Sequence, residues 1–220
     1  MKKLFYLLLA LLLITSCTPN DKRSPFEKVI NLNEETAVIT DEYILPLKNE
    51  SIPLEARYVY STLPAKDTQQ TTIKGKNIKI ELLATSEQLP PYSTIYINRA
   101  TNESYGICEP RKAVPCKTLG KITALDYIEH NPITPYDWLK KIQPPAKTIG
   151  TASINQQATT IIITKNNNKT ITLWINDYYH LPIKVEITRQ EGEETITEKT
   201  YFYNQLQTGN IKQKEVEPEQ

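Results

Sequence analysis

The chain has 220 residues, of which 39% are hydrophobic and 23% are charged. Its 26 lysines and arginines balance its 25 aspartates and glutamates, so the overall charge gives no reason to expect a nucleic-acid partner. Six glycines, thirteen tyrosines and an abundance of threonine and isoleucine favour a β-sheet over a helical bundle.

The N-terminal segment has the pattern of an export signal. Two lysines precede the apolar run from Leu4 to Ile14, which is shorter than the roughly twenty residues that a membrane-spanning helix needs. The sequence therefore predicts a secretory signal peptide over residues 1–16 and an extracytoplasmic location for the rest.

The end of this signal, Ile14-Thr15-Ser16-Cys17, resembles the lipobox of bacterial lipoproteins. The resemblance implies that Cys17 carries a diacylglyceryl anchor and becomes the mature N-terminus, on the outer side of the cytoplasmic membrane or in an outer membrane. A plain signal peptide with a coincidental cysteine, or an uncleaved anchor, is the alternative. Residues 17–25 are polar and contain two prolines, so we expect a short tether there.

Alternation with a period of two, interrupted by short polar turns, predicts antiparallel strands along most of the chain. Two weaker candidates are 37–40 and 43–47, and a short helix could cover 26–31. The main predicted strands are Arg57–Thr62, Thr71–Lys74, Ile78–Leu82, Thr94–Asn98, Ser104–Cys108, Thr159–Thr164, Thr170–Ile175, Pro182–Thr188 and Thr195–Tyr203.

The remaining two cysteines, Cys108 and Cys116, are separated by seven residues that include two prolines. In an oxidising compartment they can close a hairpin disulfide. His130 and His180 lack the paired spacing of a zinc site, so no metal or other cofactor is predicted.

Two helices are predicted to interrupt the sheet, within an insertion at about 121–143. Ile122, Leu125 and Ile128 recur every three residues in the segment 121–129. The second helix, 134–142, begins with a threonine cap and a proline at its first position. We expect one β domain over 26–210, with a frayed tail over 211–220.

The order of hairpins, helices and further hairpins resembles the LolA/LolB-like fold of lipoprotein carriers and lipid-binding lipoproteins. That fold is a curved antiparallel sheet, an incomplete barrel whose mouth is covered by helices. His180 stands where that family commonly has a glycine before Leu-Pro. The matching segments are residues 73–81, 94–98, 104–107, 173–177 and 181–186.

No nucleophile elbow, zinc-protease helix, P-loop or dinucleotide fingerprint occurs, so the chain is not expected to be an enzyme. His180 and Asp177 could form a base and its orienting acid. Both fall in a predicted tight turn, however, where an aspartate more often bonds the local backbone.

Alternation instead predicts that three strands turn apolar side chains to one concave face. Such a face could bind a lipid or a lipoprotein acyl chain. The alternative is an envelope scaffold or interaction module whose own side chains fill the space. The candidate groove residues are Ile78, Ile80, Leu82, Ile171, Leu173, Ile175, Ile183, Val185 and Ile187.

Overall fold

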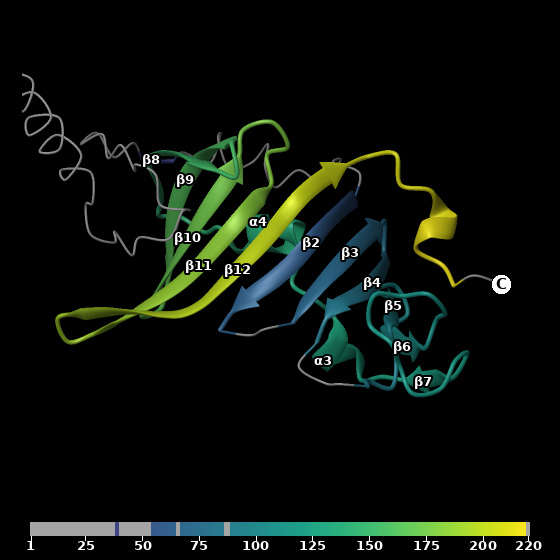
Figure 1. Cartoon of the computed structure of the whole chain (residues 1–220). Helices are drawn as coiled ribbons and strands as arrows, with labels where there is room; N and C mark the ends of the chain where they lie inside the picture. The colour runs from purple at the N-terminus through teal and green to yellow at the C-terminus, as the bar shows by residue number, and fades with distance from the viewer. Residues whose placement is uncertain (1–37, 40–53, 65–66, 86–88, 219–220) are drawn as a thin grey trace, which may run out of the picture.

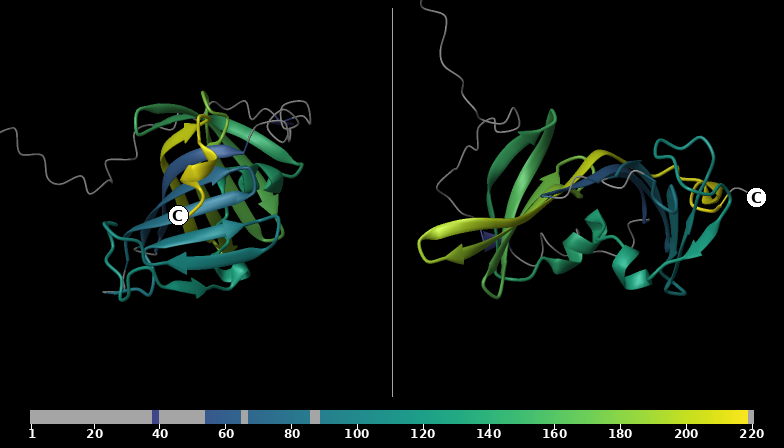
Figure 2. Two further views of the ribbon diagram at one scale, coloured as in Figure 1. Left: turned by 90° about the vertical axis from the view of Figure 1, so that its right-hand side faces the viewer. Right: turned by 60° about the horizontal axis from the view of Figure 1, so that its bottom comes forward.

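The structure is a computed structural model that describes residues 38–39, 54–64, 67–85 and 89–218 (Figure 1). These residues form a mainly β fold, as predicted. Twelve strands make one antiparallel sheet, and two short helices lie inside its curve (Figure 2). The candidate helix 26–31 and the candidate strand 43–47 lie outside the described residues.

The order of strands across the sheet is β1-β8-β9-β10-β11-β12-β2-β3-β4-β5-β6-β7, with β1 and β7 at its edges. The strands are β1 (Val38–Ile39), β2 (Glu55–Leu63), β3 (Thr68–Lys74), β4 (Asn77–Ala84), β5 (Thr94–Asn98), β6 (Glu103–Ile107), β7 (Ile122–Ala124), β8 (Ala146–Ile154), β9 (Gln157–Asn166), β10 (Lys169–Asn176), β11 (Pro182–Glu191) and β12 (Glu194–Thr208).

All nine main predicted strands are present, and the short turns between them have the expected chemistry. Gly75 has a φ of 60° in the β3–β4 turn, and Asn167 has a φ of 56° in the β9–β10 turn. Both values lie in the left-handed region that glycine and asparagine tolerate best. The strands β7 and β8 were not predicted.

The helices are shorter than predicted: α3 covers Tyr127–His130 and α4 covers Pro135–Lys141. The predicted helix over 121–129 is helical only at its end, because its first part pairs with β6 as strand β7. Ile122 and Ile128 are 66% and 87% exposed. Their spacing therefore does not mark a buried helical stripe, and α3 begins only after its cap, Asp126.

The C-terminal segment is packed against the sheet as far as Val216, whereas the sequence predicts a frayed tail there. A 3₁₀ helix, η1 (Gln213–Glu215), lies over the sheet, and Glu215 forms an ion pair with Arg57 of β2. Ile211 and Val216 are almost fully buried. Burial of these two apolar side chains keeps an otherwise polar segment against the sheet.

Candidate ligand-binding face

The connection between β7 and β8 must cross a face of the sheet, because these consecutive strands lie near opposite edges. Residues 125–145, which we call the crossing segment, make this connection and contain both helices. They run along the concave side of the sheet (Figure 2). The topology thus places a helical cover over the curved face.

Local sequence fixes where α4 begins. The Thr134 hydroxyl accepts from the Asp137 backbone N–H, and the Asp137 carboxylate accepts from the Thr134 backbone N–H. This reciprocal capping satisfies two amides that a helix start leaves free, and Pro135 supplies a preset φ. Pro135, Tyr136, Trp138 and Leu139 are buried, so the short helix turns most of its apolar surface to the sheet.

The Trp138 indole is the centre of the contact between α4 and the sheet. Its Nε1–H donates to the Tyr203 hydroxyl over 2.7 Å, and that hydroxyl donates to the Ile133 carbonyl over 2.9 Å. The Trp138 ring also packs edge-on against Tyr201, with 5.0 Å between centroids. Every polar atom in this series of hydrogen bonds has a partner. The indole N–H is therefore buried without the free-energy cost of an unsatisfied donor.

Polar contacts hold the crossing segment on both sides of Trp138. On one side, Arg99 in the β5–β6 turn forms a two-pronged ion pair with Asp137, at 2.9 and 3.2 Å. Arg99 also donates to the Pro132 carbonyl over 2.6 Å. On the other side, the Thr164 hydroxyl of β9 donates to the Gln143 carbonyl over 2.8 Å.

Burial alone would raise the pKa of Asp137, but the Arg99 guanidinium and hydrogen bonds from Thr134 hold it below the ordinary value. The opposite holds for the phenols between the crossing segment and the sheet. Burial raises the pKa of Tyr203 well above its usual range and that of Tyr136 to about 12. The concave face therefore carries neutral hydroxyls, with its charges at the rim.

Eight of the nine predicted groove residues belong to one apolar cluster with the buried residues of α4. Register places Ile171 opposite Ile187 and Leu173 opposite Val185, so these four share a face. Leu82 does not join this cluster. The eight are Ile78, Ile80, Ile171, Leu173, Ile175, Ile183, Val185 and, partly buried, Ile187.

Sequence reasoning missed most of what covers this face. Trp138, at 2% exposed, is a packing residue of this cover. Neither its bond to Tyr203 nor the Arg99–Asp137 pair had a sequence signal, because each joins segments far apart in the chain. Only the threonine cap and the proline marked the start of α4.

In the β10–β11 turn, His180 and Asp177 form hydrogen bonds with different partners. His180 has a φ of 55°, the left-handed conformation that glycine would adopt more easily, and its backbone N–H donates to the Asn176 carbonyl. The Asp177 carboxylate instead accepts from the Thr160 hydroxyl over 2.9 Å. The expectation that Asp177 bonds the local backbone is wrong, because the Asn176 side chain does so.

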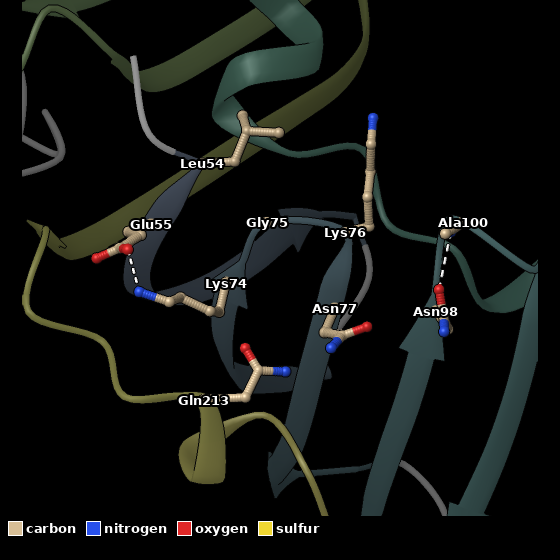
Figure 3. Close-up of a pocket in the computed structure, with 9 residues that line it drawn as sticks. All are labelled: Leu54, Glu55, Lys74, Gly75, Lys76, Asn77, Asn98, Ala100 and Gln213. Atoms are coloured by element: carbon tan, nitrogen blue, oxygen red, sulfur yellow. Dashed lines mark hydrogen bonds and ion pairs between the residues drawn. The ribbon is translucent and has the colours of Figure 1, made fainter. Parts of the chain in front are cut away.

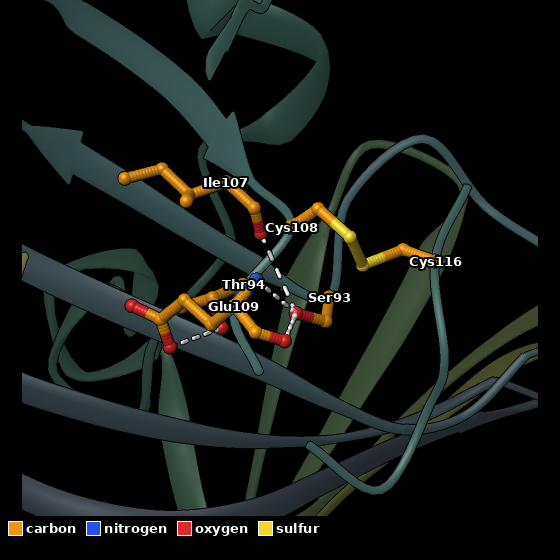
Figure 4. Close-up of a disulfide and its surroundings, with 6 residues drawn as sticks. All are labelled: Ser93, Thr94, Ile107, Cys108, Glu109 and Cys116. Carbon is orange, nitrogen blue, oxygen red and sulfur yellow. Dashed lines mark hydrogen bonds between the residues drawn. A yellow bond between two sulfur atoms is a disulfide. The ribbon is translucent and has the colours of Figure 1, made fainter. Parts of the chain in front are cut away.

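The predicted disulfide between Cys108 and Cys116 is confirmed, with 5.7 Å between their Cα atoms (Figure 4). Beside it, the Glu109 carboxylate accepts from the hydroxyls of Thr94 and Tyr96. Burial would raise the pKa of Glu109, but these bonds and Lys112 hold it below the ordinary value. The disulfide loop is thus folded onto the outer face of the sheet.

Two surface cavities lie away from the concave face. One, of about 480 Å³, is bordered by the Glu55–Lys74 ion pair, Asn77, Asn98 and Gln213 (Figure 3). The other, of about 600 Å³, is lined mainly by charged side chains of β2, β4 and the C-terminal segment. None of the nine predicted groove residues lines either cavity, and most of the residues around both carry charged or amide side chains, which do not suit an acyl chain.

The fold and its site define a protein built on a single curved antiparallel sheet with a helical cover. Residues 133–215, from α4 to η1, are similar to a family described as predicted periplasmic protein (DUF2092). The matched part includes Trp138, Leu173 and Tyr203, and the family's description is consistent with the export predicted from the sequence. No curated protein matches the chain. In the part of the chain that the structure describes, no helix is both long and apolar enough to cross a membrane.

Proposed function

We propose that the chain is a lipid-anchored protein of the cell envelope that binds an apolar ligand on its concave face. The ligand would be a lipid or the acyl chain of a lipoprotein, and the anchor would be Cys17, which lies outside the described residues. One observation carries the proposal: a continuous apolar cluster lines the curved face, and a crossing segment with two short helices covers it.

Ligand binding requires α4 to move. A helix of seven residues is only marginally stable by itself, so its position depends on Trp138 and on the polar contacts of Arg99 and Thr164. An acyl chain that replaces the α4 side chains against Leu173 and Val185 buries similar apolar surface. The exchange is therefore close to balanced, and a ligand can shift the population towards an open form.

The second candidate is an envelope interaction module whose core is permanently filled. The observation that favours it is the depth of the α4 contacts, since Trp138 and Ile142 are 2% and 0% exposed. In that case α4 is part of the core, and no ligand replaces it.

A titration with a hydrophobic fluorescent probe separates the two functions. Leu173→Trp should abolish saturable binding, because the larger side chain occupies the ligand's place. Thr172→Trp is the matched control, since the neighbouring position on β10 points to the opposite face. Absence of saturable binding to the unmutated protein would favour the filled module.

A further inference from the structure

The loop that joins β6 to β7 has an uneven charge. The loop, residues 108–121, contains four cations and one acidic residue, Glu109, although the charges of the whole chain nearly balance. Lys112 forms ion pairs with two glutamates. Arg111, Lys117 and Lys121 are exposed, and no described carboxylate lies within ion-pair distance of them. This loop therefore presents three uncompensated positive charges.

The same loop exposes two large apolar side chains. Leu119 is 70% exposed and Ile122 is 66% exposed. They lie in a run of six consecutive exposed residues, 117–122, which we call the basic turn. Exposed aliphatic side chains next to lysines are typical of protein surfaces that meet an interface rather than bulk water.

Backbone geometry holds Leu119 at the tip of this turn. The Lys121 N–H donates to the Thr118 carbonyl over 3.3 Å, which closes a four-residue turn. Gly120, its third residue, has a φ of 72°, a value that favours glycine. Leu119 is the second residue and projects outward.

The disulfide fastens the basic turn to the sheet. The Gly120 N–H donates to the Cys108 carbonyl over 2.8 Å, and the Cys108 N–H donates to the Lys121 carbonyl over 3.3 Å. Cys108 is fully buried and covalently joined to Cys116 (Figure 4). The exposed leucine and lysines are therefore held in one arrangement at the β7 end of the sheet (Figure 1).

We propose that the basic turn is a docking surface for an anionic lipid membrane. Leu119 and Ile122 enter the boundary between headgroups and acyl chains, while Arg111, Lys117 and Lys121 bind lipid phosphates. A second copy of the chain fits this surface less well, because pairing two basic turns brings like charges together. The contact is independent of the proposed ligand and orients the sheet towards a bilayer.

Vesicle co-sedimentation tests this proposal. The protein is produced without residues 1–16 and carries Cys17→Ser, so that neither the signal peptide nor an acyl anchor contributes. The vesicles are phosphatidylcholine with or without phosphatidylglycerol. Binding should require phosphatidylglycerol and fall as salt rises. At about 1 kcal/mol per lysine, Lys117→Gln/Lys121→Gln should weaken it roughly 30-fold. Leu119→Ser/Ile122→Ser should weaken it several-fold.

Matched controls remove the same groups elsewhere. Lys147→Gln/Lys165→Gln takes two exposed cations from β8 and β9, and Tyr178→Ser removes a side chain that is 82% exposed in the β10–β11 turn. Both should bind vesicles as the parent does. Equal binding to both kinds of vesicle, or equal losses in the controls, would overturn the proposal. So would a dimer in sedimentation that Leu119→Ser/Ile122→Ser dissociates.

Discussion

Trp138 of the crossing segment and Tyr203 of β12, 65 residues apart in sequence, are joined by a buried hydrogen bond of 2.7 Å. The Tyr203 hydroxyl also donates to the Ile133 carbonyl at the N-terminal side of α4. One phenol thus binds two points of the crossing segment. It connects the cover directly to the strand beneath.

Tyr203→Phe should destabilise the protein by about 1–3 kcal/mol, because it leaves the Trp138 indole N–H and the Ile133 carbonyl buried without this partner. Urea unfolding measures the change. Tyr201→Phe provides the control, since Trp138 packs against the Tyr201 ring, which this substitution retains. A loss in Tyr201→Phe as large as in Tyr203→Phe would contradict the assignment.

Lowering the pH should weaken the contacts of Asp137 that keep α4 against the sheet. The folded-state pKa of Asp137 lies below its ordinary value of 3.8. Its stabilising contribution is therefore complete above about 3.8 and is lost as the pH falls from there through the folded-state pKa. The stability difference between the unmutated protein and Asp137→Asn should shrink over that range. If this stability difference stays the same from pH 7 to pH 2, within the error of the unfolding curves, the Arg99 pair does not set the pKa of Asp137.

Cys17→Ser tests the anchor. If Cys17 carries a diacylglyceryl group, the change should move the protein from the membrane fraction to the soluble fraction or leave it unprocessed, because two or three acyl chains provide stable anchoring. Fractionation followed by immunoblotting measures this. Thr18→Ser leaves Ile14–Cys17 unchanged and serves as the comparison. Unchanged membrane association of Cys17→Ser would exclude the anchor.

The strands were predictable because their alternation is strong and their turns contain glycine and asparagine. Strand β8 was missed, since Ala146–Ile154 has few large apolar residues and pairs through an irregularity near Gly150. The spacing of Ile122, Leu125 and Ile128 suggested a helix, but edge strand β7 and the exposed end of α3 share that stretch. Three-residue spacing alone does not separate these states.

Predicting the shared apolar face needed only strand register, which alternation determines well. Its cover could not be predicted to the same depth. Thr134 and Pro135 marked the start of α4, whereas the contacts that hold the helix come from Arg99, Thr164 and Tyr203 in distant segments. Such contacts depend on the sheet's curvature and strand order, which no local pattern specifies.

Movement of Trp138 tests the central claim most directly. The chain has two tryptophans, so Trp174→Phe leaves Trp138 as the only indole reporter. During titration with a long-chain fatty acid, its emission should shift to longer wavelength and saturate, as the indole leaves its buried site for water. Leu173→Trp adds a second indole, so its ligand binding is followed separately by calorimetry. If the Trp138 emission stays unchanged and the protein without Leu173→Trp shows no heat of binding, the cover is not displaceable. The permanently filled module then remains.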